Sequence, residues 1–168
     1  VIAVPEAQID EVRLRLEAMG APLEYIHLYP CASNDSWARD HGPITVYNQA
    51  GETLWLNFEF TGWGNKFDAR LDNQINGRLF GASMVKTTAL ESVDLVLEGG
   101  AIETDGQGLF LANENCLLHA NRHPNLQKAQ LEQRLSELFG IQKFLWLQQP
   151  PLCGDDTDGH IDTLARLT

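Results

Sequence analysis

The sequence predicts a mixed α/β fold built from repeated β-β-α-β units. It has 168 residues, 43% of them hydrophobic and 21% charged, which is enough for one globular core. The stretch 40-DHGPITVYNQAGETLWLN-57 aligns with 98-EGGAIETDGQGLFLAN-113. Each begins with an acid, has glycine two places on and isoleucine four places on, and continues through a turn into a strand that ends in Asn. His160, which follows glycine and precedes isoleucine, begins a third unit.

Repeated units of this length are typical of blades around an axis or of a solenoid. In either case Asp40, Glu98 and His160 would occupy equivalent positions and converge on the axis. The alternative is two similar hairpins that arose by chance within a mixed sheet. We expect residues 1–168 to form a single domain that is an incomplete part of a ring, with exposed sheet edges.

Hydrophobic periodicity and turn residues predict the elements of the first half. Apolar residues at helical spacing and a following glycine predict a helix over 5–19, and Pro30 ends a strand over 23–29. Further on we expect a hairpin of strands 44–47 and 53–60, a helix over 71–79 and a short strand over 84–88.

The second half repeats this order. We expect strands over 93–97, 101–104 and 109–112, with a turn at 105–108 between the last two. A helix over 126–139, with Asn125 as its cap and Gly140 beyond it, then leads to a strand over 143–147.

Charge and composition exclude several classes of function. The net charge of −11 argues against general affinity for nucleic acid or anionic membranes; it suits a small cationic ligand, or serves only solubility. No apolar run approaches the roughly 20 residues that span a bilayer, and no leader-like segment follows Val1. The three cysteines lack CxxC spacing, which indicates a reduced, cytoplasmic protein without a disulfide framework or a zinc site.

Two stretches suggest a site for a planar cation. In 34-NDSWARDHGP-43, a carboxylate such as Asp40 beside Trp37 can hold a cation by ion pairing and cation–π contact. Alternatively, this is a polar loop in which Arg39 pairs with Asp35 or Asp40. In 97-LEGGAI-102, Glu98 ends an apolar strand and could take part in proton transfer in a dry site, or could be a solvated turn residue.

The stretch 154-GDDTDGHID-162 carries the strongest signal. A calcium loop does not fit, because Gly154 stands where its first Asp should be and Ala165 where its last Glu should be. His160 and Asp162 could ligate a transition metal, but no second histidine cluster has suitable spacing. As a catalytic element, His160 would move protons, with Asp162 projecting to the same side of an extended segment. An acidic turn with a satisfied histidine is the structural alternative.

Five stretches together resemble one enzyme family: NDSWARDHGP, FTGWGNKF (60–67), LEGGAIETDGQG, NRHP (121–124) and GDDTDGHID, in this order. They are similar to the agmatine deiminase and Porphyromonas-type peptidylarginine deiminase family of guanidine-modifying enzymes. The resemblance implies a pentein-type α/β propeller of five ββαβ units. It also implies hydrolysis of a guanidinium to a ureido group and ammonia through a cysteine thiouronium intermediate, without metal or other cofactor.

The resemblance also implies a role for each matching residue. Asp40 and Asp162 would grip the guanidinium nitrogens, and His160 would protonate the departing ammonia and then deprotonate water. Glu98 would orient His160, and Trp37 would line the channel over the substrate. The partner would be a small guanidinium cation: agmatine is preferred, which would give N-carbamoylputrescine, with peptidyl or free arginine as the alternatives.

The family's nucleophilic cysteine has no counterpart here. Cys31, Cys116 and Cys153 do not match its glycine-rich segment, and a pairing of Cys153 with His160 is a poor substitute. We therefore expect residues 1–168 to be inactive alone. Two alternatives are a non-catalytic guanidinium-binding module that forms a homo-oligomer and a metal-dependent hydrolase that uses the acidic cluster.

Overall fold

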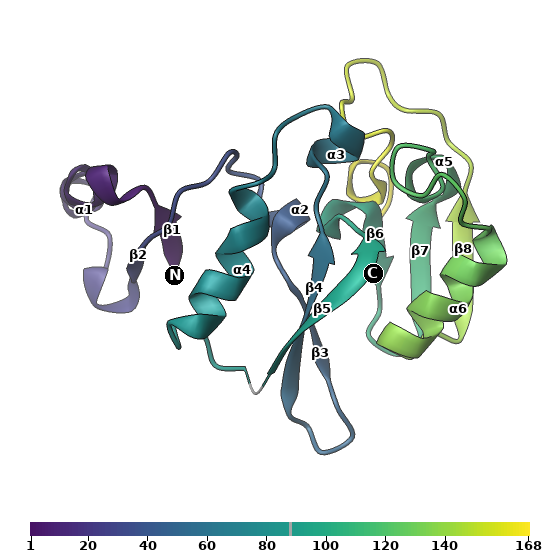
Figure 1. Ribbon diagram of the computed structural model, residues 1–168, viewed down its shortest axis with the longest axis horizontal. Coiled ribbons are helices and arrows are strands. Elements are labelled where there is room, and N and C mark those ends of the chain that lie inside the picture. Colours follow the sequence, from purple (N-terminus) through teal and green to yellow (C-terminus); the bar gives the residue numbers. More distant parts are fainter. Residues whose placement is uncertain (88) are drawn as a thin grey trace.

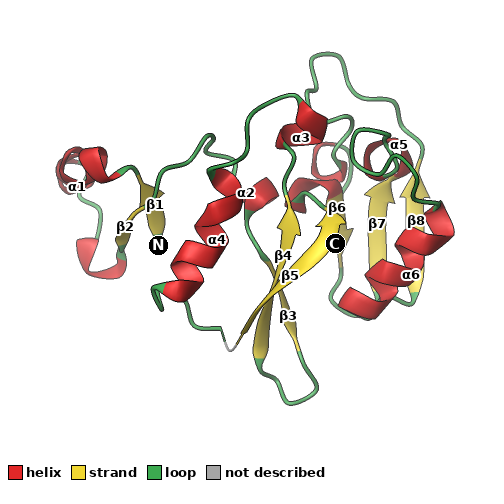
Figure 2. Cartoon of the chain, viewed as in Figure 1, coloured by secondary structure: helices red, strands yellow, loops and turns green. Residues whose placement is uncertain are grey.

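The computed structural model describes residues 1–87 and 89–168 as a mixed α/β chain (Figures 1 and 2). One small two-stranded sheet lies at the N-terminal end, and two three-stranded sheets follow. Within the described residues, no helix is long and apolar enough to cross a membrane.

The N-terminal segment pairs two short parallel strands. Its elements are β1 (Ile2–Val4), η1 (Glu6–Gln8), α1 (Ile9–Ala18), η2 (Leu23–Tyr25) and β2 (Leu28–Pro30). The predicted helix is confirmed, with a 3-10 turn at its start. The strand predicted over 23–29 is wrong at its first residues, because a turn follows Pro22, whose carbonyl accepts a hydrogen bond from Tyr25 N (3.0 Å).

The first repeat has β-β-α-β order. It consists of β3 (Ile44–Tyr47), β4 (Thr53–Glu59), α3 (Gly62–Asn65), α4 (Asp72–Gly81) and β5 (Ala89–Val96). Strand β4 pairs antiparallel with β3 and parallel with β5. The predicted hairpin is confirmed, and so is the helix.

The strand predicted over 84–88 is wrong for 84–87, and Thr88 lies outside the described residues. Residues 84–87 connect α4 to β5, which contains most of the stretch predicted as 93–97. Polar residues such as Glu91 and Asp94 obscured the length of β5, which pairing with β4 fixes.

The second repeat has the same topology. It consists of β6 (Ile102–Thr104), β7 (Leu109–Asn113), α5 (Glu114–Leu117), α6 (Lys128–Phe139) and β8 (Lys143–Leu147). The elements follow the predicted β-β-α-β order, and strand β7 pairs antiparallel with β6 and parallel with β8. The N-cap of α6 is Gln127, in a capping box with Gln130, and not Asn125.

One apolar cluster joins both repeats. It combines Leu56 and Phe58 of β4 with Phe110 of β7 and the fully buried Leu131 and Leu135 of α6. On this core rest three short elements: α2 (Ala38–His41), η3 (Gly99–Ala101) and η4 (Ile161–Thr163). Asp40 lies in α2, Glu98 directly precedes η3, and His160 directly precedes η4. Because η3 packs against both α2 and η4, segments far apart in sequence meet at one place.

Candidate active site

Asp40 is the buried carboxylate of α2, with 6% of its surface exposed. The backbone N–H of Gly100 donates to its Oδ1 (2.9 Å), and the indole Nε1–H of Trp63 donates to its Oδ2 (3.0 Å). Arg39 donates instead to Ile102 O (3.4 Å). Asp40 is therefore held by the Gly100 and Trp63 donors and not by pairing with Arg39. The two donors fix its plane before any ligand binds.

The turn that presents Trp63 is left-handed. Residues 62 to 65 have φ values of 62°, 58°, 80° and 65°. Such a run is rare for L-residues, and a Cβ on Gly62 would lie 2.1 Å from Phe67 O, so glycine is required there. Backbone strain of this kind is characteristic of functional sites, and here it directs an indole N–H at Asp40.

Two glycines let three polar side chains converge. A Cβ on Gly99 would lie 2.0 Å from Arg39 O, which shows how closely η3 approaches α2. A Cβ on Gly100 would lie 2.5 Å from His160 Nδ1, 2.7 Å from Asp40 Oδ1 and 2.8 Å from Asp162 Oδ2. The absent side chain of Gly100 therefore marks the point where these three groups meet.

His160 is nearly fully buried and lies between two carboxylates. Its Nε2 is 2.9 Å from Glu98 Oε2, and its Nδ1 is 3.6 Å from Asp40 Oδ1. Glu98 has no exposed surface, so the alternative of a solvated turn residue is wrong. Because a carboxylate only accepts, Glu98 selects the tautomer that carries its proton on Nε2, and Nδ1 then faces Asp40 and Asp162.

A cavity of about 470 Å³ opens in front of these groups. Its lining residues are Asp35, Trp37, Arg39, Asp40, Trp63, Phe67, Asp156, Thr157, His160, Asp162 and Thr163. The volume suits a small molecule. Trp37 is 60% exposed and borders the cavity, and its role as a channel residue stays a prediction.

Two carboxylates of the acidic loop before His160 stabilise the loop through hydrogen bonds and ion pairs. Asp155 accepts from Thr157 N (2.7 Å) and Gly159 N (2.8 Å). Partial burial acts against the charge, but these hydrogen bonds lower the pKa of Asp155 below its usual value. Asp158 pairs with Lys66 Nζ (2.6 Å) and Arg122 Nη1 (2.7 Å), which sequence reasoning did not anticipate.

Arg122, like Trp63, had no role assigned to it from the sequence. It belongs to NRHP (121–124), one of the five stretches that resemble the deiminase family. Its side chain is 1% exposed, and its Nη2 lies 2.8 Å from Glu98 Oε2. It therefore lies directly behind the Glu98–His160 pair.

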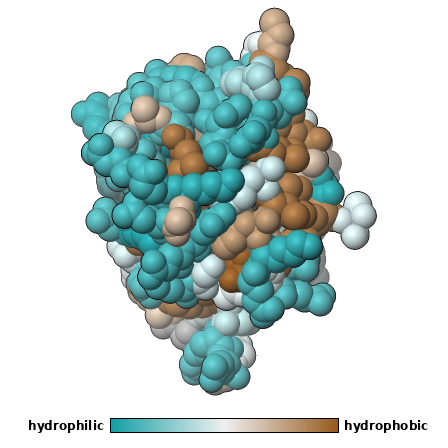
Figure 3. Space-filling model, turned by 90° about the vertical axis from the view of Figure 1, so that its right-hand side faces the viewer, coloured by the Kyte–Doolittle hydropathy of each residue, from teal (hydrophilic) through white to brown (hydrophobic). Residues whose placement is uncertain are grey.

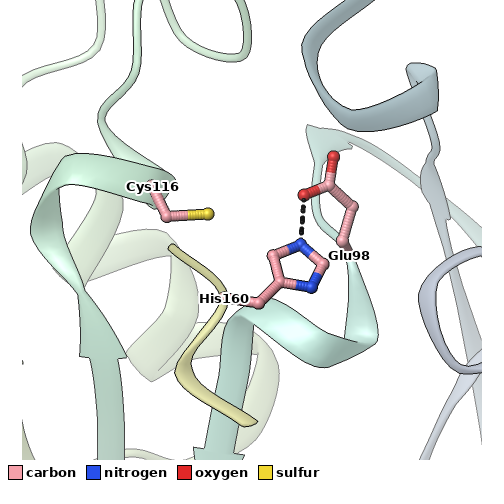
Figure 4. Close-up of side chains that lie close together, drawn as sticks. All are labelled: Glu98, Cys116 and His160. Carbon is pink, nitrogen blue, oxygen red and sulfur yellow. Dashed lines mark hydrogen bonds and ion pairs between the residues drawn. The ribbon is translucent and has the colours of Figure 1, made fainter. Parts of the chain in front are cut away.

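Cys116 also points toward the Glu98–His160 pair (Figure 4). Ligand atoms of the three residues lie within 4.8 Å of one another. Burial raises the pKa of the Cys116 thiol to about 12, so at neutral pH the thiol is protonated and is not a nucleophile. Arg122 already forms an ion pair with the carboxylate of Glu98, so Glu98, Cys116 and His160 fit a metal ion poorly.

The chain matches one protein family over its whole length. A model of the Porphyromonas-type peptidyl-arginine deiminase family covers residues 1–168. The agmatine deiminase of Pseudomonas syringae pv. syringae (strain B728a) is 38% identical over 170 residues, which cover 98% of this chain and 44% of the relative.

Solved structures show the same likeness. The agmatine deiminase of Enterococcus faecalis aligns with a TM-score of 0.84 at 32% identity, over 98% of this chain and 44% of that chain. A cysteine-to-serine variant of the C. jejuni agmatine deiminase with substrate bound aligns with a TM-score of 0.82 at 40% identity, over 92% of this chain and 45% of that chain. The chain thus spans somewhat less than half the length of these relatives.

Proposed function

The chain belongs to the Porphyromonas-type peptidyl-arginine deiminase family, and from this membership we propose that it supplies the guanidinium-binding and proton-transfer groups of an agmatine deiminase. The reaction is hydrolysis of agmatine to N-carbamoylputrescine and ammonia. The observation that carries the proposal is the convergence of Asp40, His160 and Asp162 around Gly100, beside a cavity of about 470 Å³. Agmatine is preferred because relatives that match nearly the whole chain are agmatine deiminases.

Asp40 and Asp162 bind the guanidinium. This cation is planar, permanently charged and rich in N–H donors, and paired carboxylates match its geometry. Gly100 and Trp63 hold Asp40 in place, so little reorientation is needed when the substrate enters. The aromatic walls Trp37 and Trp63 complement the flat cation.

His160 moves protons at Nδ1, the nitrogen that faces Asp40 and Asp162. Nδ1 of His160 takes the proton of the cysteine thiol, the thiolate attacks the guanidinium carbon, and the C–N bond breaks as ammonia leaves with the proton from Nδ1. Water then gives a proton to His160 and attacks the thiouronium carbon, and the C–S bond breaks to release the thiolate and the ureido product, whose hydroxyl proton passes to solvent as the carbonyl forms.

The nucleophilic thiolate comes from a segment outside residues 1–168. Cys31 and Cys116 are buried, and Cys116 is held protonated, whereas the exposed Cys153 is not among the residues that line the cavity. In the same proposal, residues 1–168 form one incomplete domain, and their two ββαβ units belong to a five-unit propeller.

The test uses the full-length polypeptide that contains residues 1–168. Ureido product and ammonia are measured with agmatine, a peptidyl arginine and free arginine as substrates. We expect turnover of agmatine, and a loss of at least 100-fold in kcat/KM for Asp162→Asn, because one of the two carboxylates that hold the cation is gone.

Three results would count against this proposal. Preference for peptidyl arginine would move the assignment to the alternative substrate. Calorimetric binding of agmatine without turnover would indicate a binding module, provided that Asp40→Asn abolishes the heat. Activity that a chelator abolishes would favour the metal-dependent hydrolase.

A further inference from the structure

Arg122 is a buried cation with no place in the chemistry described above. Its Nε–H lies 2.9 Å from Glu98 Oε2 and 3.1 Å from Glu98 Oε1. Its Nη2 also donates to Thr157 O (3.0 Å), and its Nη1 donates to Asp158 Oδ2 (2.7 Å). Arg122 is not among the residues that line the substrate cavity.

These bonds form a line of alternating charges. Lys66 pairs with Asp158, Asp158 with Arg122, and Arg122 with Glu98, which in turn holds His160. Lys66 caps the C-terminal end of α3, Arg122 lies in the loop before α6, and Glu98 directly precedes η3. Asp158 and His160 lie in the loop before η4. Arg122 is the link between the loop that carries His160 and the carboxylate that His160 contacts.

This network fixes the charge and the orientation of the Glu98 carboxylate. Burial opposes the guanidinium charge, yet the neighbouring Glu98 and Asp158 carboxylates raise the pKa of Arg122 above its usual value. The fixed cation compensates the charge of a carboxylate that has no exposed surface. It also holds the plane of Glu98 so that Oε2 faces His160 Nε2.

We propose that Arg122 is a positioning residue for proton transfer: it orients Glu98 and thereby keeps the proton of the neutral His160 ring on Nε2, with Nδ1 toward the substrate. The inference rests on the proposed deiminase function and deepens it. Stability alone does not explain this network, because a buried ion pair is often no more stabilising than apolar side chains of the same volume.

The first test is Arg122→Lys in the full-length polypeptide that contains residues 1–168. Lysine keeps the charge but loses the planar set of donors, so the orientation of Glu98 is relaxed. We expect kcat for agmatine to fall about 10- to 100-fold while KM changes less than about threefold, since a placed general acid–base contributes about 100- to 10,000-fold. Arg70→Lys, at an exposed ion pair with Asp68, is the matched control and should leave both constants unchanged.

A cycle with Glu98→Gln separates positioning from a general structural effect. If Arg122 acts through Glu98, Arg122→Lys should lower kcat by less than about threefold in the Glu98→Gln background. An equal loss in both backgrounds overturns the proposal. Asp158→Asn serves if Arg122→Lys fails to fold: it removes one anchor of Arg122 at a partly exposed position, and we expect kcat about 3- to 10-fold lower with KM unchanged.

A third measurement needs no substrate and distinguishes this inference from the proposed function. The ¹⁵N chemical shifts of His160 report which ring nitrogen carries the proton. We expect Nε2–H in the parent protein and in Arg70→Lys, and a mixture of tautomers in Arg122→Lys. Unchanged shifts in Arg122→Lys overturn the inference even if agmatine is the substrate; the expected change in an inactive parent supports it and rejects only the proposed reaction.

Discussion

At the scale of single residues, Trp63 has the most specific contact with the proposed guanidinium site, because its indole N–H donates to Asp40 Oδ2 at 3.0 Å. Trp63→Phe keeps an aromatic ring and removes this donor. A hydrogen bond to a charged group is worth about 1.5–3 kcal/mol, so we expect kcat/KM for agmatine to fall about 10- to 100-fold. Steady-state kinetics of the full-length polypeptide provide the measurement.

Trp55→Phe is the control for this change, since Trp55 lies on β4 and is not among the cavity residues. Equal kinetics for Trp63→Phe and the parent protein would mean that the left-handed turn at Trp63 serves packing alone.

Asp155 gives a prediction about pH. Partial burial notwithstanding, hydrogen bonds from Thr157 and Gly159 depress its folded-state pKa below the value of 3.8 that applies to an ordinary Asp. A depressed carboxyl pKa contributes stability that is fully present above the unfolded-state value and is lost as the pH falls through the folded-state value. Asp155→Asn should therefore destabilise the chain at pH 7 and have a smaller effect below about pH 4.

Urea denaturation of both proteins across this pH range measures the effect. A stability difference that stays constant from pH 7 to pH 3 would show that the charge of Asp155 does not hold the loop before His160.

The sequence predicted five site residues, and the structure brings four of them together: Asp40, Glu98, His160 and Asp162. Their residue types and flanking glycines carried that signal. Trp63 and Arg122 were missed, because their importance comes from tertiary contacts with Asp40 and Glu98 that no local pattern records. Their catalytic and positioning roles remain predictions.

At the scale of elements, the sequence predicted those with strong local patterns, such as the hairpin of β3 and β4 and the helix α6. The start of β5 was misplaced because the register of pairing with β4 decides it. Pattern reasoning therefore succeeds where apolar spacing and turn residues agree, and fails where a partner strand sets the boundary.

Gly77 inside α4 and Gly140 at the end of α6 should respond to alanine in opposite ways. Gly140 ends α6 with φ of 68°, and a Cβ there would meet nothing within 4 Å, so Gly140→Ala suffers only the left-handed strain of about 1–2 kcal/mol. Gly77 lies inside α4, where its Cβ would also meet nothing, so Gly77→Ala should stabilise by about 1 kcal/mol. Urea denaturation measures both changes; effects of the same sign would contradict this account of the two positions.

At the scale of the whole molecule, the two repeats leave an apolar face uncovered at β8. Among the described strands, β8 pairs only with β7. Figure 3 shows apolar side chains gathered on the face that forms the right-hand side of Figure 1, where β8 and α6 lie. Leu145 of β8 and Leu152 beyond it are 38% and 49% exposed. An edge strand with apolar neighbours favours association.

We therefore expect residues 1–168, expressed alone, to self-associate through this face. Leu145→Lys places a charge on the edge strand and removes a leucine whose burial is worth about 1.5–3 kcal/mol, so the association constant should fall at least about 10-fold in sedimentation velocity experiments. Met19→Lys, at an 81% exposed position after α1, is the matched control and should leave association unchanged. If both variants behave as the parent chain does, association occurs elsewhere, and β8 is not the surface that a further unit of the fold would cover.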